Sequence, residues 1–361
     1  MELNGNTPDY DTKPFNNHTD SKIRLSIIIK ALNEQAKIEA AIRSALASAR
    51  GIDAEVILAD SLSTDNTVEL ATRYPIKIVQ LINPRDRSCG IGPQLGFQFS
   101  CGEYIYLMDG DMELQPDFIR GALHQMRQHP DIAGIGGLVE EINVENIIFQ
   151  SRKYQASIHM KPGVVDRLNM GGLYRRSAIQ SIGYFSNRNL HSFEEFELAL
   201  RLRARGWKLL RIPIISIKHY GHIIPEFKLL RRRFTSRYAQ GPGELLRAAL
   251  GKSYFYSVLR EFKVFLIMIF YWLLMLASLL FIHNTIIWST LAVIGLAGLT
   301  AILFKKGLRR GIYSITAWHV FGLATLLVFF KNQTDPASAI DSRLITESSM
   351  HKMDEISARP I

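Results

Sequence analysis

Two aspartates separated by one glycine, Asp109 and Asp111, are the residues of this chain best suited to binding a metal ion. They follow the apolar run 104–108, which is typical of a buried strand. In open α/β sheets, ligands bind beyond the carboxyl ends of the strands, and Mg²⁺ or Mn²⁺ take carboxylate and phosphate oxygens. The pattern favours a cation that carries a diphosphate, although an Asp-Gly pair after a strand is also ordinary turn chemistry.

The elements that must position these acids alternate between strand and helix. Such alternation predicts a parallel sheet with helices on its faces. Asp60 ends one of the expected strands, so we expect it to face the same crevice as the two aspartates. Three acids at one edge need a cation or a polar ligand to offset their repulsion. The expected strands are 23–29, 54–60 and 76–79, and the expected helices are 36–47 and 63–72.

Several loose motifs, taken in order, resemble the family-2 glycosyltransferases with the GT-A fold. Each is weak alone, but five or six in register are a strong signal, and the resemblance covers roughly residues 23–240. The nucleotide half of that family is matched by Asn33-Glu34, 60–65, 94–96, 100–104 and 109–111, and its acceptor half by 171–176, 194–198 and 203–207.

The resemblance implies a GT-A domain over residues 23–224, a mostly parallel α/β sheet flanked by helices. It also implies inverting transfer of a sugar from a nucleotide-diphosphate donor, with Mg²⁺ or Mn²⁺ stabilising the negative charge of the leaving group. By the same match, the metal ligands are Asp111 first, then Asp109 and His219, and the donor-binding residues are Asn33, Glu34, Asp60, Asp109 and Arg176.

A general base must accept the proton of the attacking hydroxyl, and the acidic pair Glu194-Glu195 is the candidate. The family usually has Glu-Asp here with the second acid as base, so the resemblance assigns the role to Glu195 and keeps Glu194 as the alternative. The competing interpretation is a solvated first turn of the helix 196–204, where acids are favoured by the helix dipole.

Some positions depart from the family pattern. Leu62 stands where a Gly is common, so we expect a turn without positive φ. Lys30 is expected to be solvated rather than to approach a phosphate. His219 follows the expected strand 212–217 and is either a metal ligand or a structural residue. The stretch 231–238 replaces the Gln-x-x-Arg-Trp of polymerising members, which argues against a processive synthase.

The last third of the chain has the composition of a membrane segment. No charged residue occurs from Val264 to Phe304, and the polar break 283–285 divides this run into two segments of about twenty residues, each long enough to cross a bilayer. A third apolar segment follows at 311–330. We therefore expect a transmembrane region of about three helices at 263–330, preceded by interfacial amphipathic helices at 225–262.

Basic residues flank these apolar segments and account for much of the formal net charge of +10. Positive residues in short flanking loops favour the cytoplasmic side, so we expect the catalytic domain in the cytoplasm of a multi-pass protein of the cell membrane. If all three segments span, the tail after Lys331 lies outside. No nucleic-acid motif accompanies the charge, and anionic membrane lipids are the simpler partner.

The two ends of the chain are polar. Residues 1–22 contain no apolar core of a signal peptide, and we expect both this segment and the tail 331–361 to lack regular structure. The two cysteines, Cys89 and Cys101, suggest neither a zinc site nor a disulfide framework.

The leading hypothesis is a metal-dependent, inverting glycosyltransferase that adds one sugar to a hydroxyl of a lipid-linked or polysaccharide acceptor. UDP-sugars are expected ahead of GDP-sugars, because Asp60 offers an acceptor to a pyrimidine N–H. The alternatives are transfer to polyprenyl phosphate, which needs little help from a base, and a catalytically silent membrane scaffold of a polysaccharide assembly.

Overall fold

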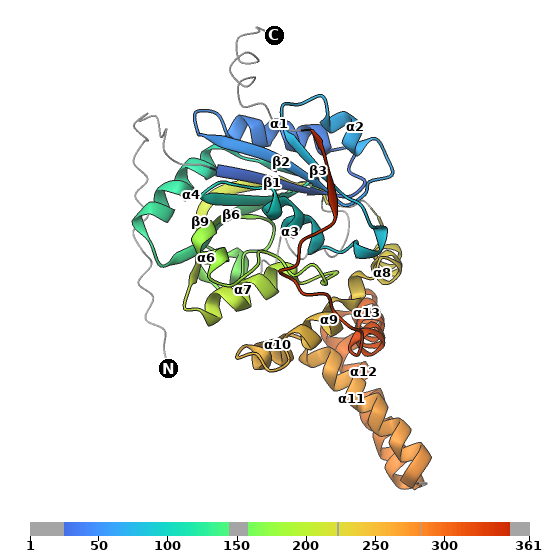
Figure 1. Cartoon of the computed structure of the whole chain (residues 1–361). Coiled ribbons are helices and arrows are strands. Elements are labelled where there is room, and N and C mark those ends of the chain that lie inside the picture. The colour runs from blue at the N-terminus through green and yellow to red at the C-terminus, as the bar shows by residue number, and fades with distance from the viewer. Residues whose placement is uncertain (1–24, 144–157, 222–223, 283, 347–361) are drawn as a thin grey trace.

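The computed structural model of the chain describes residues 25–143, 158–221, 224–282 and 284–346. The expectation for the N-terminal segment 1–22 lies outside these residues. A single mixed sheet forms the centre of an α/β domain, and a group of helices extends from one end of it (Figure 1).

The sheet has ten strands in the order β10-β3-β2-β1-β4-β8-β6-β9-β5, with β7 paired to β9. The strands β3, β2, β1 and β4 are parallel to one another, as the alternating pattern predicts, and β6 is parallel to β9, whereas β8, β5 and β10 pair antiparallel. The bounds are β1 Leu25–Ala31, β2 Ala54–Asp60, β3 Lys77–Leu81, β4 Tyr104–Asp109, β5 Met112–Leu114, β6 Ile132–Glu141, β7 Gly163–Val165, β8 Gly172–Arg175, β9 Lys208–His219 and β10 Ser342–Thr346.

Both faces of the sheet are covered by helices, which is why the central strands are apolar throughout rather than alternating. Helices α1 (Ile38–Ser48), α2 (Thr67–Ala71) and α4 (Pro116–Gln128) bury one face. Helices α3 (Ile91–Gln98), α6 (Arg176–Gln180) and α7 (Glu194–Ala204) bury the other. The expected α/β architecture is confirmed.

The register of the sheet brings the acidic residues to one edge. Lys30 on β1 lies beside Asp109 on β4, and Ala31 lies beside Asp60 on β2. The carboxyl ends of three parallel strands therefore meet where the sequence predicts. The following turn differs from expectation: Leu62 has φ 64°, a left-handed conformation. Arg87 holds it there by donating hydrogen bonds to the carbonyl oxygens of Ser61 and Leu62.

Three amphipathic helices follow the sheet: α8 (Glu226–Thr235), α9 (Gly241–Ala248) and α10 (Phe255–Glu261). They bury apolar side chains against the domain and against a later helix, while Phe227, Phe234, Leu250 and Tyr256 stay exposed. Leu245 and Leu246 of α9 pack on α7, the helix that carries the acidic pair. Amphipathic helices are therefore present within 225–262 and pack on the helix that carries the acidic pair.

Among the described residues, three helices are long and apolar enough to cross a membrane: α11 (Lys263–Ala277, continued by η4, Ser278–Ile282), α12 (Thr285–Lys306) and α13 (Leu308–Val328). Figure 1 shows α11 and α12 projecting away from the domain, whereas α13 stays beside α8 and α9. In the most apolar 18-residue stretch of α12 no residue is buried, whereas a third of the corresponding stretch of α13 is buried.

The segment after α13 returns to the α/β domain. Residues 342–346 form β10, which pairs antiparallel with β3 at the edge of the sheet (Figure 1). Ile340 is buried in the core beneath α3, and its amide donates to Gln98 Oε1 at 2.9 Å. The expectation of a tail without regular structure is therefore wrong for this part of it, because β3 presents an edge that a polar sequence can pair with through its backbone.

Candidate active site

A cavity of about 610 Å³ opens at the carboxyl edge of the sheet. Its walls come from both halves of the domain and from the amphipathic helices, so it lies between the sheet and the C-terminal helices. Of the predicted site residues, those that line it are Glu34, Asp109, Asp111, Glu194, Glu195 and His219.

Lys30 joins the two acidic groups of the cavity. Its Nζ lies 3.1 Å from Asp109 Oδ1 and 3.0 Å from Glu194 Oε1. Burial disfavours the charged amine, yet the two carboxylates raise the pKa of Lys30 well above its usual value. The expectation of a solvated Lys30 is wrong: it is a fixed cation that connects the end of β4 to the start of α7.

Asp111 and His219 form the second cluster. His219 ends β9, and its Nε2 lies 3.5 Å from Asp111 Oδ2 while its Nδ1 lies 2.6 Å from Glu141 Oε2. Burial opposes the charged ring, but the hydrogen bonds with the two carboxylates raise the pKa of His219 to about 9. Burial and then the charge of Asp111 raise the pKa of Glu34 to about 7. The negative charges of the carboxylates at this edge are therefore only partly balanced by nearby positive groups.

Two side chains of this edge could serve as ligands of a divalent cation. No group of three or more His, Cys, Asp or Glu side chains among the described residues is arranged to hold a metal. Asp111 and His219 would be its two ligands, and a cation would have to displace the proton of His219 Nε2 in order to bind there. Glu141 lies at the other ring nitrogen, as carboxylates do behind metal-binding histidines. Mg²⁺ commonly takes only one or two protein ligands and completes its shell with substrate phosphates.

Glu195 faces the cavity from the first turn of α7. Its carboxylate accepts hydrogen bonds from the amides of Met170 and Gly171, each at 3.3 Å. The left-handed Phe193 (φ 66°) precedes the helix and sets its first turn. Burial raises the pKa of Glu195 to about 7, against the opposing charge of Lys30. Glu195 is therefore an oriented carboxylate whose pKa suits proton transfer near neutral pH, whereas Glu194 is held in an ion pair.

Three of the residues predicted to bind the nucleotide-sugar donor lie outside the cavity. Asp60 is fully buried and accepts hydrogen bonds from the Ser63 amide at 3.0 Å and from Gln80 Nε2 at 2.7 Å. Asn33 accepts from the Thr64 amide at 2.7 Å and so fastens the turn after β2. Arg176 donates to Ser100 Oγ at 2.7 Å and to the Gly102 carbonyl, at the start of β4 and far from the acidic edge.

The sequence interpretation did not assign several residues that the structure brings to the cavity. These residues are Lys30, Arg87, Arg232 and Arg233, which add positive charge to its lining, and His191, which adds an imidazole ring. The signal for the two arginines was present in the basic run 231–233, which α8 carries past the cavity mouth. His191 gave no signal, since it lies in an irregular segment before α7.

The comparisons with known proteins agree with this geometry. The family model described as glycosyl transferase family 2 matches residues 26–183. Among curated proteins, the chain is 25% identical over 252 residues to glucomannan 4-beta-mannosyltransferase 7 of Arabidopsis thaliana, covering 63% of this chain and 44% of that protein. It is 26% identical over 128 residues to a dolichol-phosphate mannosyltransferase of Pyrococcus furiosus, covering 34% and 36%. The chain thus spans less than half the length of these relatives.

Among solved structures, a mannosyltransferase of Pyrobaculum calidifontis in complex with GDP-Man and Mn²⁺ is similar over 89% of this chain and 91% of its own, with a TM-score of 0.56 and 15% identity. The likeness shows that the two proteins share a fold. Together with the family match and the sheet described above, it leads to one assignment: residues 26–183 are a glycosyl transferase family 2 domain, within a GT-A-like fold that continues into long apolar C-terminal helices.

Proposed function

We propose that the protein is a membrane-bound, inverting glycosyltransferase that moves a single sugar from a nucleotide-diphosphate sugar to a hydroxyl of a lipid-linked or polysaccharide acceptor. The observation that carries this proposal is the pairing of two different acidic sites in one cavity: the Asp111–His219 edge, suited to a cation and a diphosphate, and the oriented carboxylate of Glu195.

Asp111 and His219 are the residues that would hold Mg²⁺ or Mn²⁺, which when bound supplies positive charge to the diphosphate leaving group. Lys30 keeps Asp109 and Glu194 close without repulsion, and Arg232 and Arg233 add positive charge to the same cavity. These basic side chains support the binding of a donor that carries two phosphates.

Glu195 is proposed as the base. It receives two backbone N–H bonds that fix its direction, whereas Glu194 is engaged by Lys30 at 3.0 Å. Protonation of Glu195 at the end of the transfer is eased by its burial, which already raises its pKa to about 7. This contrast supports the assignment made from the family pattern, with Glu194 as the alternative.

The nucleotide of the sugar donor is the next part of the proposal. The preference for UDP-sugars depended on Asp60, whose carboxylate is already bound by Ser63 and Gln80. The curated relatives named above are mannosyltransferases, and the similar solved structure holds GDP-Man. GDP-mannose should therefore be tested beside the UDP-sugars. Transfer to polyprenyl phosphate is the alternative function, favoured by the resemblance to a dolichol-phosphate mannosyltransferase.

The test uses the full chain in detergent with Mn²⁺. We expect slow hydrolysis of one nucleotide sugar, abolished by excess chelator, and faster turnover when an acceptor extract is added. Unchanged turnover in chelator would remove the metal from the mechanism. Neither binding nor turnover of any UDP- or GDP-sugar would instead favour the silent scaffold.

For the membrane, we propose that α11 and α12 cross the bilayer as a hairpin and that α13 lies along its surface. Arg309, near the start of α13, pairs with Glu226 of α8, at 2.7 Å from Nη2. Near its other end, Thr325 and Val328 contact Gly243 of α9 so closely that a Cβ there would overlap them. Between these points α13 packs on α8 and on the short helix η3 (Tyr238–Gln240) through Tyr313, Ala317, Val320, Phe321 and Ala324.

The return of the tail supports the same topology. Because β10 pairs with the sheet of the catalytic domain, the chain must cross the bilayer an even number of times between the domain and β10. The basic residues near the hairpin lie at its domain end, at Lys263, Lys305 and Lys306, which favours a cytoplasmic domain. The tail is then cytoplasmic too, rather than outside as the three-span expectation required.

Reporter fusions test this topology. Fluorescent protein fused after Ile361 should be bright, and alkaline phosphatase fused there should be inactive, as for a cytoplasmic end. A single cysteine placed at Asn284, with Cys89 and Cys101 changed to Ser, should react with a membrane-impermeant maleimide from outside. An active phosphatase at the C-terminus would show that α13 also crosses.

A further inference from the structure

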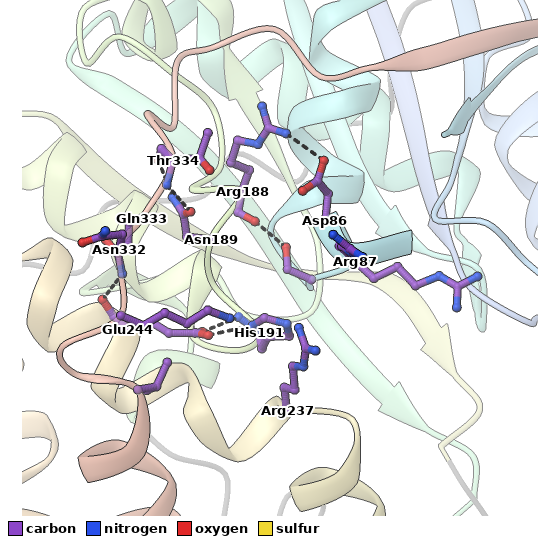
Figure 2. Close-up of a pocket in the computed structure, with 14 residues that line it drawn as sticks. Asp86, Arg87, Arg188, Asn189, His191, Arg237, Glu244, Asn332, Gln333 and Thr334 are labelled. Atoms are coloured by element: carbon purple, nitrogen blue, oxygen red, sulfur yellow. Dashed lines mark hydrogen bonds and ion pairs between the residues drawn. The ribbon is translucent and has the colours of Figure 1, made fainter. Parts of the chain in front are cut away.

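A second pocket, separate from the acidic edge, lies where the segment after α13 meets the catalytic domain (Figure 2). Its volume is about 190 Å³. The walls come from the turn after β3, from the irregular segment before α7, from the residue before η3 and from residues 331–334. The pocket thus exists only because the chain returns to the domain after its apolar helices.

The lining is strongly basic, with five arginine and lysine side chains against two carboxylates. Arg188 pairs with Asp86 at 3.4 Å, and Arg87 donates to backbone carbonyls. The side chains of Arg85, Arg237 and Lys331 make no hydrogen bond or ion pair with any described residue. The two carboxylates of the lining are engaged elsewhere, Asp86 with Arg188 and Glu244 with His191. An anionic ligand would therefore offset the mutual repulsion of these three cations.

His191 adds a second, independent observation. Its Nδ1 lies 2.7 Å from Glu244 Oε1, and its amide donates to Glu244 Oε2 at 2.9 Å, so the ring is fixed in place (Figure 2). Its other nitrogen, Nε2, is buried and has no hydrogen-bond partner among the described residues. A buried polar atom without a partner is costly. Because Nδ1–H donates to the Glu244 carboxylate, Nε2 is left to accept, and the O–H of a singly protonated phosphate would satisfy it.

The position of the pocket indicates which kind of molecule would carry the bound anion. Arg87, Ser88 and His191 line both this pocket and the catalytic cavity, so the two spaces share a wall. Val328 and Lys331 lie on its other side, at the end of α13, where the proposed topology places the membrane surface. An anion bound here would lie between the bilayer and Glu195.

We propose that this pocket binds the phosphate group of a lipid carrier whose attached sugar is the acceptor. The inference depends on the proposed function and names the acceptor class of that site. With the phosphate held by Arg237, Lys331 and His191, the lipid chain extends toward the bilayer and the sugar extends along the shared wall toward Glu195. A carrier phosphate that was itself the acceptor would have to lie in the catalytic cavity instead.

Calorimetry on the full chain in detergent tests the pocket directly. The probes are farnesyl diphosphate, neutral farnesol and inorganic phosphate. We expect farnesyl diphosphate to bind, with affinity roughly tenfold weaker or more for each charge removed in Arg237→Gln and Lys331→Gln. Arg310→Gln is the matched control, since this exposed basic residue lines neither cavity, and its affinity should equal that of the wild type.

Three outcomes would overturn the proposal. If the double variant Arg237→Gln/Lys331→Gln binds farnesyl diphosphate as tightly as the wild type does, the pocket is not the binding site. If inorganic phosphate binds as tightly as farnesyl diphosphate, the pocket is a site for a free anion. If farnesol binds equally well, the affinity comes from the apolar chain alone. Acceptor-independent hydrolysis of the nucleotide sugar should be the same in all variants. If even the wild type hydrolyses no donor while the lipid probe binds as expected, the proposed function fails and the phosphate site remains.

Discussion

The catalytic edge and the C-terminal helices differ in what determines their structure. At the edge, each predicted acid follows a strand, and the parallel register alone brings Asp109 and Asp111 to the cavity. In the last third, three segments have similar apolar length, yet α12 has no buried residue while α13 lies along the domain. Hydropathy indicates which helices can cross a bilayer, and in the topology proposed above the attachments at their ends decide which of them do so.

The largest effect expected is at the edge, in Asp111→Asn. This change keeps the size of the side chain but removes the charge that would hold the cation, so turnover should fall by roughly 10³-fold or more and donor affinity should fall with it. Donor hydrolysis and calorimetry with the nucleotide measure both. The control is Glu113→Gln, which likewise turns a carboxylate into an amide. Glu113 lies two residues after Asp111 and outside the cavity lining, so this change should have little effect.

Glu195→Gln should separate chemistry from donor binding. The amide keeps the shape of the side chain but accepts no proton, so sugar transfer should fall by roughly 10²–10⁴-fold while nucleotide affinity changes little. Glu194→Gln is the matched control. If Glu194→Gln loses transfer and Glu195→Gln does not, the base is Glu194. If both variants transfer normally, the acceptor is a phosphate and the polyprenyl-phosphate alternative is correct.

The pH dependence sharpens the same comparison. A base must be deprotonated to act, so wild-type kcat/KM should rise with pH up to about 7 and then level off, following the pKa of Glu195. The charge of Lys30 lowers that pKa, so Lys30→Met should move the rise to higher pH. Profiles measured at saturating metal give the shift. A rise at the same pH in both proteins would show that another group controls the rate.

The positions of the acids at the strand ends could be predicted from the sequence because the evidence for them is local. The expected strand 54–60 coincides with β2, and the acids at the strand ends followed from periodicity. The contacts that the sequence did not predict join distant residues: Lys30 with Glu194, 164 residues apart, and His219 with Glu141, 78 apart. Asp60 ended its strand as predicted but was captured by Ser63 and Gln80, which no periodicity reveals.

The smallest effect expected concerns stability, and it tests whether the tail belongs to the domain. Ile340 is buried under α3, and its amide bonds to Gln98, although the sequence placed it in a tail without regular structure. Ile340→Ala should lower the free energy of unfolding of the catalytic domain by about 2–4 kcal/mol, as for other large-to-small changes in a core.

Leu344 on β10 is the matched control, because it lies on the same returning segment but is 45% exposed. Leu344→Ala should cost less than about 1 kcal/mol, since it removes little buried area. Denaturant unfolding of the full chain in detergent, followed by the fluorescence of Trp207, separates the two after the other tryptophans are changed to Phe. Equal, small effects would mean that the tail only rests on the sheet. A large effect at Ile340 alone would make the returning segment part of the domain core. The chain could not then cross the membrane three times between the domain and this segment.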